Sequence, residues 1–391
     1  MTHFKLSLPA LALAGVLTVS THAQAQELKI GLMSTLSGPG AALGNDQVDA
    51  FMLAVEQLGG KMAGRTVTVF KEDDQLKPEV GAQIAQKFLQ KDKVDLVTGV
   101  IFSNVMMAVH KPITDSGTFF IGSNAGPSPI AGKGCSPFYF STSWNNDQLH
   151  ESGAAVANLR GYKNVYVLAP NYQAGKDAVS GFKRVFKGKI ADEVYTAVNQ
   201  PDYSVEIAAI QAAKPDAIYT FYPGGMGVNF VKQYRQAGLF GKIPMVSAST
   251  IDGSTLPALK DQALGAQTGT PYSPDLDNQQ NRQFVAYFKK KYFREPSMYA
   301  AQSYDAAMLI NSALLKTKGS LADKDAFRKA MRAADFQSVR GSFKFNTNHF
   351  PIANFYQADV VKDGSGIASF KTIGVVMKDA KDAYADQCAM K

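Results

Sequence analysis

Short apolar runs alternate with longer amphipathic segments along most of this chain. The alternation starts with an apolar run over 28–33 and a helical pattern over 46–58, and it restarts after a break at 141–146. Strands that alternate with helices of this length are typical of parallel sheets covered by helices. The predicted strands lie at 28–33, 66–70, 94–100, 118–121, 165–168, 190–195, 217–221 and 244–246, and the predicted helices at 46–58, 80–90, 105–114, 149–159, 174–186, 207–213 and 228–237. The pattern therefore predicts an α/β protein in which one plan is laid down twice, as two lobes.

The pattern changes after residue 270. Amphipathic helices are predicted at 278–292, 299–315 and 326–334, and strands at 343–345, 355–361 and 372–376. No low-complexity linker interrupts the chain, so we expect ordered crossings between the lobes. Open α/β sheets bind ligands at the carboxyl ends of their strands, and two such lobes facing each other would form a cleft there.

The first 25 residues have the order of an export signal. His3 and Lys5 precede an apolar run over 6–19, and Ala23-Gln24-Ala25 places small residues before a cleavage site. The apolar run is too short to cross roughly 30 Å of hydrocarbon as a permanent anchor. We predict a signal peptide over 1–25, which is removed on export, so that the mature chain works outside the cytoplasm.

Composition and charge narrow the choice of class. The roughly 366 residues that remain after the predicted cleavage are too many for one compact core and suit two lobes. The formal net charge is +8, but Lys and Arg are dispersed along the chain, so no nucleic-acid partner is expected.

Cys135 and Cys388 are the only cysteines of the chain. An oxidising compartment permits a disulfide between them, which would close a loop of about 250 residues and tie the tail to the body. Two buried thiols are the alternative, and we favour the disulfide.

The glycine-rich segment from Ser37 to Gly44 lies between a strand and a helix, where a nucleotide-binding turn would stand. The next strand ends in three acidic residues, at 72–74, where a ribose-binding carboxylate would stand. However, the glycine spacing is one residue off the dinucleotide fingerprint, Pro39 stiffens the turn, and nicotinamide cofactors are scarce outside the cytoplasm. An exported Rossmann-like oxidoreductase is thus a remote alternative. We favour a turn that lines a small-molecule cleft, with no cofactor.

The sequence lacks the motifs of hydrolases and metal sites. It contains no G-x-S-x-G elbow and no H-E-x-x-H pair. The histidines of the mature chain, His110, His150 and His349, lie far apart, and we interpret each as a surface or capping residue. We expect no catalytic residue, no metal ligand and no enzymatic activity.

Polar loops follow the predicted strands of the first lobe. Ser103-Asn104 follows the third strand, and Asn124-Ala125-Gly126 follows the fourth. Short hydroxyl and amide side chains beside backbone N–H groups can hold a carboxylate, above all at a helix N-terminus, although capping alone also explains them. We favour ligand contact for the set.

Aromatic residues follow the strands of the second half and accompany the break between the lobes. Tyr172 and Tyr222 stand at equivalent strand ends, where they could close over a ligand. Phe102 and Trp144 would add apolar walls.

Taken in order, these segments resemble the periplasmic solute-binding proteins of the branched-chain amino-acid (Leu/Ile/Val-binding) type, the receptor components of ABC importers. The resemblance spans nearly the whole mature chain. It rests on Leu36-Ser37-Gly38-Pro39 with Gly44, Gly59-Gly60, Glu72-Asp73-Asp74, the loop 123–127, Tyr222-Pro223, Arg235-Gln236-Ala237-Gly238-Leu239 and Tyr304-Asp305-Ala306.

The resemblance implies a type I periplasmic binding protein fold with three crossings between two closing lobes. Lobe 1 would comprise 26–142 and 271–345, and lobe 2 would comprise 143–270 and 346–391. The partners would be a small carboxylate ligand and an inner-membrane ABC permease, with a sensor protein as an open alternative to the permease. A monomer is expected.

The resemblance also assigns ligand-binding roles. Ser103, Asn104 and the loop 124–126 match the positions that hold the ligand carboxylate, and Tyr222 matches a lobe-2 tyrosine. An acidic partner for the ligand ammonium is missing from the matching loop at 246–250, and the nearest acid is Asp252. The apolar wall position in the first loop is Leu43.

This departure shapes the expected ligand. A desolvated ammonium without a carboxylate partner costs several kcal/mol, so the ligand lacks a cationic amine unless Asp252 reaches the site. The loop at 169–175, which contains Tyr172, resembles that of members that take up aromatic acids. We favour an aromatic carboxylate, with a branched-chain or other amino acid as the alternative.

Overall fold

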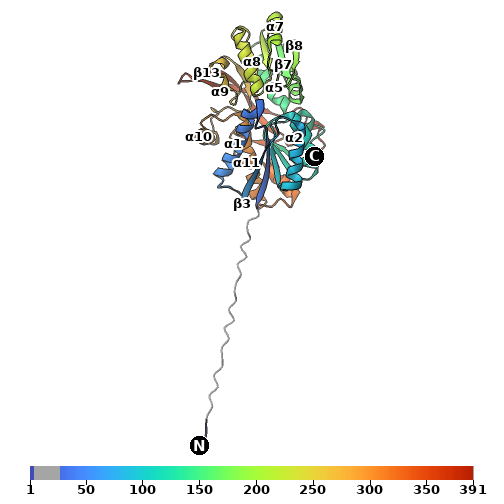
Figure 1. Ribbon diagram of the computed structural model, residues 1–391, viewed down its shortest axis with the longest axis vertical. Helices are drawn as coiled ribbons and strands as arrows, with labels where there is room; N and C mark the ends of the chain where they lie inside the picture. Colours follow the sequence, from blue (N-terminus) through green and yellow to red (C-terminus); the bar gives the residue numbers. More distant parts are fainter. Residues whose placement is uncertain (4–26, 391) are drawn as a thin grey trace.

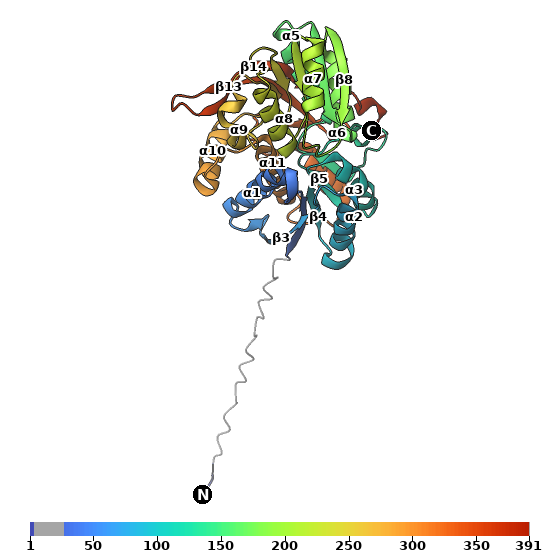
Figure 2. The ribbon, with the colours of Figure 1, turned by 45° about the horizontal axis from the view of Figure 1, so that its top comes forward.

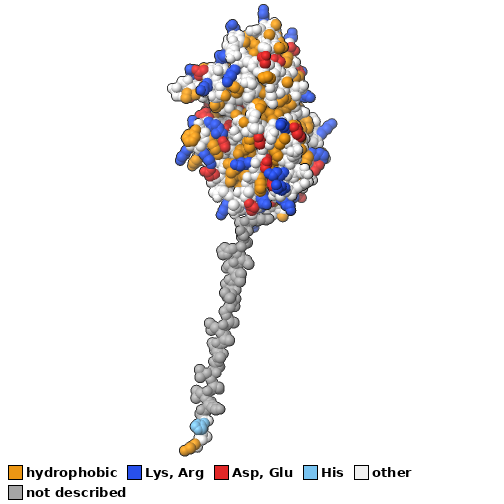
Figure 3. Space-filling model, viewed as in Figure 1, with side chains coloured by type: hydrophobic (Ala, Val, Ile, Leu, Met, Phe, Trp, Pro, Cys, Tyr) orange, Lys and Arg blue, Asp and Glu red, His pale blue; other side chains and the backbone are white. Residues whose placement is uncertain are grey.

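The computed structural model describes residues 1–3 and 27–390, which form two lobes (Figure 1). The predicted signal peptide lies outside these residues apart from its first three. Lys and Arg side chains lie interspersed with Asp and Glu over both lobes on the face in Figure 3. The predicted α/β class with two lobes is confirmed.

Lobe 1 is built on a sheet of order β2-β3-β1-β4-β5-β6, parallel except for the β2–β3 pair. Its strands are β1 (Leu28–Ser34), β2 (Lys61–Met62), β3 (Arg65–Asp73), β4 (Leu96–Gly99), β5 (Phe119–Gly122) and β6 (Tyr139–Ser141). Its helices are η1 (Gly38–Gly40), α1 (Ala41–Gln57), α2 (Pro78–Gln86), η2 (Lys87–Asp92), α3 (Ser103–Asp115) and α4 (Ser128–Ala131), joined by α10 (Gln279–Tyr292), α11 (Met298–Lys316) and α12 (Lys324–Ala333). Apolar residues of β1 pack against α1 and α11, for example Leu32, Phe51 and Ile310, all fully buried.

Lobe 2 is built on a sheet of order β12-β13-β11-β10-β9-β7-β8, with β14 paired to β13. Its strands are β7 (Asn164–Pro170), β8 (Lys189–Thr196), β9 (Ala217–Thr220), β10 (Met245–Ser247), β11 (Gln267–Thr270), β12 (Lys344–Phe345), β13 (Pro351–Lys362) and β14 (Ala368–Ala380). Its helices are α5 (Asn146–Leu159), α6 (Gln173–Val185), α7 (Ser204–Ala213), α8 (Gly225–Gln236), α9 (Leu256–Leu259) and η3 (Lys260–Ala263), and η4 (Ala385–Gln387) lies in the tail. Figure 2 shows β13 and β14 as a long hairpin that extends beyond the lobe.

The chain passes between the two lobes three times, after β6, after β11 and before β12. The three predicted crossings are therefore present, while the lobe boundaries at 142, 270 and 345 stay a prediction.

Several element ends differ from the sequence-based prediction. The predicted helix 46–58 begins earlier, at Ala41, and directly follows η1, so the glycine-rich segment is helical from Gly38 onward. The predicted strand 372–376 is the centre of β14, which is much longer. Ala368 is the one buried residue of β14, so no buried face marks the ends of this strand in the sequence.

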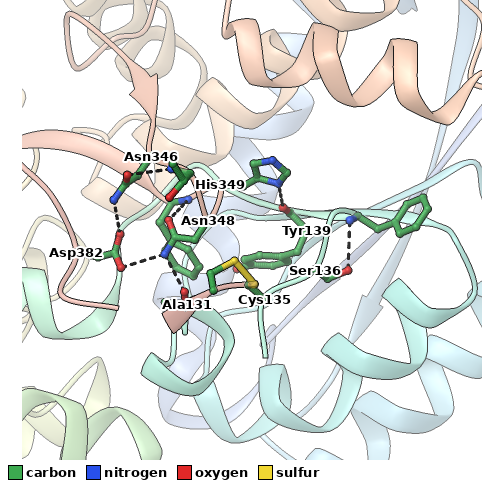
Figure 4. Close-up of a disulfide and its surroundings, with 12 residues drawn as sticks. Ala131, Cys135, Ser136, Tyr139, Asn346, Asn348, His349 and Asp382 are labelled. Atoms are coloured by element: carbon green, nitrogen blue, oxygen red, sulfur yellow. Dashed lines mark hydrogen bonds between the residues drawn. A yellow bond between two sulfur atoms is a disulfide. The ribbon is translucent and has the colours of Figure 1, made fainter. Parts of the chain in front are cut away.

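The predicted disulfide between Cys135 and Cys388 is present (Figure 4). It joins the turn after α4 to the end of η4, across 253 positions of sequence. Hydrogen bonds from the amides of Asn346 and Asn348 to Asp382 hold the same tail, at 3.1 and 3.0 Å. The C-terminal segment is thus fixed to lobe 1 covalently.

Candidate functional site

A small cavity of about 30 Å³ lies between the lobes, at the carboxyl ends of strands from both sheets. It is lined by Leu43, Ile101, Phe102, Ser103, Asn124, Ala125, Trp144, Asn146, Leu149, His150, Tyr172, Ala174, Phe221, Pro223, Ser249 and Tyr299.

The structure brings seven of the eleven predicted ligand-binding residues together in this lining: Leu43, Phe102, Ser103, Asn124, Ala125, Trp144 and Tyr172. Asn104, Gly126, Tyr222 and Asp252 lie outside it.

The loop before α3 is held in an unusual backbone conformation. Gly99 and Val100 have φ values of 111° and 66°, and a β-branched residue rarely adopts a positive φ. Val100 is kept there by two backbone hydrogen bonds, from its N–H to Met33 O at 2.7 Å and from Ala125 N to its carbonyl at 3.1 Å. This fixed turn delivers Phe102 and Ser103 to the cavity.

Ser103 is the first residue of α3 and the centre of the lobe-1 wall. Its Oγ accepts a hydrogen bond from Asn146 Nδ2 at 3.0 Å, which leaves the hydroxyl proton available to a ligand. No side chain caps the N-terminus of α3. The first N–H groups of a helix and its dipole together favour an anion.

The polar loop after β5 is hydrogen-bonded to the loop before α3. Asn124 donates from Nδ2 to Ile101 O at 2.6 Å and accepts at Oδ1 from Gln302 Nε2 at 2.8 Å. The backbone N–H of Gly126 donates to Asn146 Oδ1 at 3.1 Å. A side chain at Gly126 would collide with Trp144 O, 2.1 Å from the ideal Cβ. Gly126 therefore provides close packing at the crossing.

Aromatic rings form most of the lobe-2 wall. Tyr172 and Phe221 stack with their centroids 6.2 Å apart, and His150 meets Phe221 edge-on at 4.6 Å. Phe102 of lobe 1 approaches Tyr172 at 6.3 Å. A flat apolar ligand body would find aromatic partners from both lobes.

Tyr222 lies in the core of lobe 2. Its ring packs against Tyr203 and Phe230, each with a centroid 5.0 Å away, and its N–H donates to Thr250 Oγ1 at 2.9 Å. Because neighbouring residues of an extended segment point to opposite sides, Phe221 lines the cavity instead. A Tyr222→Ala change would open a cavity in the core, so it does not isolate a binding effect.

Asn104 also points away from the cavity. It follows Ser103 on α3, and its Nδ2 donates to Leu76 O at 3.1 Å. Its side chain therefore joins two segments of lobe 1.

The carboxylate of Asp252 forms hydrogen bonds within its own turn. It accepts from Ser254 N at 2.8 Å, Ser254 Oγ at 2.6 Å and Thr255 N at 3.2 Å, and from Tyr299 Oη at 3.2 Å. Burial raises the pKa of this carboxyl to about 6. The Ser249–Tyr299 hydroxyl pair, with its oxygens 2.6 Å apart, stands between Asp252 and the cavity.

The interpretation of His110, His150 and His349 as surface or capping residues is wrong. All three are buried, at 5%, 1% and 2% exposure. Burial lowers their pKa values to about 4, 3 and 4 respectively, since the charged imidazolium loses its water. Isolated histidines carry no periodicity signal that separates a core position from a surface one.

Replacing His110 with Phe should flatten the acid limb of the stability profile. The pKa of His110 is about 4 in the folded protein and 6.5 in the unfolded chain, so the unfolded chain takes up the proton first as pH falls. The stability from neutral His110 is present above pH 6.5 and is lost towards pH 4. Between pH 7 and pH 4 the wild type should lose on the order of 3 kcal/mol more unfolding free energy than the variant.

Urea unfolding at pH 7, 5.5 and 4 measures this difference. Phe should fit the site, because the His110 ring meets Tyr139 edge-on at 4.9 Å and its Nε2 has no hydrogen-bond partner. Parallel pH profiles for the two proteins would contradict the assignment of His110 as a buried neutral group.

The two lobes touch at the rim of the cavity. Gly224 and Gly225, at the start of α8, pack on Pro39, where added Cβ atoms would lie 2.4 Å from its O and 3.0 Å from its Cβ. After β5, Ser128 donates from Oγ to Asp147 Oδ1 at 2.5 Å and from N to Asp177 Oδ2 at 3.2 Å. These contacts join the two lobes.

Comparison with known proteins agrees with this two-lobed arrangement. A family model described as periplasmic binding protein matches residues 27–365. The chain belongs to the periplasmic binding protein family. Its members are solute-binding receptors, which are not enzymes.

Two solved structures of this family are similar over nearly their whole length. An ABC transporter solute-binding protein from R. palustris in complex with benzoate has a TM-score of 0.88 at 32% identity, covering 93% of this chain and 99% of that chain. One from Rhodopseudomonas palustris BisB5 in complex with 3,4-dihydroxy benzoic acid has a TM-score of 0.84 at 28% identity, covering 91% and 99%. Leu/Ile/Val-binding protein homolog 6 of Brucella melitensis is 28% identical over 377 residues, covering 93% of this chain and 94% of its own.

Two further observations concern the part of the chain that the structure describes. Within residues 1–3 and 27–390, no helix has the length and apolar character to cross a bilayer. The same residues contain no cluster of three or more His, Cys, Asp or Glu side chains suited to a metal ion.

Proposed function

We propose that this periplasmic binding protein is the receptor of an ABC uptake system and captures a small aromatic carboxylate between its lobes. It would work in the periplasm as a monomer and deliver the ligand to an inner-membrane permease. The same chemistry would serve a sensor protein as partner.

The observation that carries the proposal is the chemistry of the cavity lining. Among the described residues that form it there is no Asp, Glu, Lys or Arg. The ammonium group of an amino acid would thus be desolvated without a carboxylate, at a cost of several kcal/mol. A ligand carboxylate would instead be stabilised in the cavity, because the Ser103 hydroxyl and the uncapped N–H groups at the start of α3 supply hydrogen-bond donors.

The aromatic side chains of the lining support an aromatic ligand body. Rings of Phe102, Trp144, Tyr172 and Phe221 face the cavity from both lobes and the crossing. The benzoate and dihydroxybenzoate complexes of the two similar structures point in the same direction.

The alternative is a branched-chain or other amino acid as ligand. The similarity to Leu/Ile/Val-binding protein homolog 6 of Brucella melitensis favours it. It requires Tyr299 to move so that Asp252 reaches the cavity, which would break the hydrogen bond between them. The remote alternative, an exported oxidoreductase, would use the glycine-rich segment to bind a dinucleotide. In the structure this segment packs against the start of α8 through Pro39.

A thermal-shift panel on refolded, ligand-free protein tests the proposal. The panel sets benzoates and hydroxycinnamates beside leucine, valine and short dicarboxylates. A ligand with micromolar affinity at millimolar concentration stabilises by about 4 kcal/mol. We expect a shift from aromatic acids, and a shift from leucine or valine alone would contradict the proposal.

A second test uses Gly225→Val, a variant that should hinder closure of the two lobes on the ligand. The branched side chain would collide with Pro39, since a Cβ at Gly225 already lies 3.0 Å from Pro39 Cβ. A ligand that contacts both lobes binds in proportion to the population of the closed state, so we expect benzoate affinity to fall by at least about tenfold.

The control is Gly374→Val, because Gly374 lies in β14 with open space around it. Titration calorimetry with benzoate measures both variants, and small-angle scattering checks that Gly225→Val is more open. Wild-type affinity in the Gly225→Val variant would show that closure is not needed for binding.

A further inference from the structure

His150 is a polar residue of the cavity lining to which no role in ligand binding has been assigned above. It lies on α5, four residues after Asn146, so the two side chains share one face of the helix. Asn146 donates to Ser103 Oγ at the start of α3, at 3.0 Å. His150 therefore faces the same end of the cavity as the helix N-terminus proposed to receive the carboxylate.

A buried tyrosine fixes the orientation of the His150 ring. Tyr219 Oη lies 2.5 Å from His150 Nδ1. The Tyr219 ring is itself held in place, with Phe182 stacked on one side at 4.1 Å and Gly153 of α5 against its edge. A Cβ at Gly153 would lie 2.5 Å from Tyr219 Cε2, so the absence of a side chain there admits the ring.

The same contact sets the tautomer of His150. Tyr219 is fully buried, and among the described residues its hydroxyl has no partner other than His150. A buried hydroxyl proton without an acceptor is costly, so Tyr219 donates to Nδ1. Nδ1 is then unprotonated, and the proton of the neutral imidazole resides on Nε2.

The protonated Nε2 is free to serve a ligand. No described residue forms a hydrogen bond with it, although the His150 side chain lies in the cavity lining. Burial lowers the pKa of His150 to about 3, so the ring stays neutral near pH 7.

We propose that His150 is the lobe-2 donor to the ligand carboxylate, through Nε2–H, and that Tyr219 is the positioning residue that fixes this tautomer. The inference rests on the proposed function and assigns the contact that ties lobe 2 to the bound anion. A fixed N–H donor also disfavours an ammonium group at this place, which strengthens discrimination against amino acids.

Nitrogen NMR of the ligand-free protein with ¹⁵N-labelled histidine tests the tautomer directly. His150→Gln identifies the signals. We expect a protonated, pyrrole-type Nε2 and an unprotonated, pyridine-type Nδ1, and a change in the Nε2–H signal on titration with benzoate. A protonated Nδ1, or a His150 signal unmoved by saturating benzoate, would overturn the inference.

Titration calorimetry with benzoate tests the contribution to binding. Because a hydrogen bond to a charged group is lost, His150→Phe should weaken affinity about tenfold or more. Tyr219→Phe should weaken it less and yield a mixture of His150 tautomers. The matched control His110→Phe replaces a buried histidine outside the lining and should bind as the wild type does.

The outcomes separate the inference from the proposed function. Wild-type protein that binds benzoate, with a His150→Phe variant of equal affinity, would overturn the inference alone. Wild-type protein that binds no aromatic acid would overturn the proposed function and the inference with it.

Discussion

Replacing both Cys135 and Cys388 with Ser should lower the free energy of unfolding by on the order of 5 kcal/mol, less any strain in the bond. The disulfide closes a loop spanning 253 positions, so its loss restores much conformational freedom to the unfolded chain. The variant should still fold, because Asp382 and Tyr384 hold the tail through hydrogen bonds to Asn348 and Asp147 at 3.0 and 2.8 Å.

Urea unfolding of the oxidised protein, the reduced protein and the double variant measures this effect. Reduced wild-type protein is the control, because it lacks the bond but keeps both sulfur atoms. It should match the double variant. Equal unfolding midpoints with and without reductant would show that the disulfide contributes little to stability.

Asp305→Ala should destabilise the protein by about 3–5 kcal/mol, because it leaves a buried guanidinium without its counter-charge. Asp305 is fully buried on α11 and accepts from Arg340 Nε at 3.0 Å. It also accepts from Ser338 Oγ and Val339 N, at 2.6 and 3.1 Å. Arg340 donates in turn to the carbonyls of Thr142 and Ser143 in the first crossing. The pair thus holds the first crossing to lobe 1.

The matched control is Asp335→Ala. Asp335 pairs with Lys316 at 2.9 Å, but both side chains are exposed, so the pair should contribute about 0–1 kcal/mol. Urea unfolding at pH 7 compares the two variants. A loss at Asp305→Ala no greater than at Asp335→Ala would contradict the role of the buried pair.

The sequence predicted the fold because its signals are local. Apolar runs such as 28–33 and 165–168 each fill a buried strand of a parallel sheet. Loops that follow such strands meet at one edge of the sheet, which is why Ser103 and Asn124 could be assigned to one site from the sequence. The disulfide could be predicted because the chain has two cysteines and an export signal that leads to an oxidising compartment.

The rest of the site depends on register and on long-range packing. Phe221 and Tyr222 are neighbours in the sequence, and their side chains point to opposite sides of the chain. Which of the two rings faces the cavity depends on where β9 ends, which the sequence does not define to one residue. Ser249 and Tyr299 meet across 50 positions of sequence, and no local pattern announces that contact. His150 lies within a helix, where a polar residue is ordinarily exposed.

Titration calorimetry of refolded, ligand-free protein with benzoate and with L-leucine tests the central claim most directly. A cavity with donors but without an acidic side chain should bind benzoate at one site with an affinity of roughly micromolar order, and it should not bind millimolar leucine. Leucine binding tighter than benzoate binding would contradict the account, and it would mean that Asp252 serves the ligand ammonium.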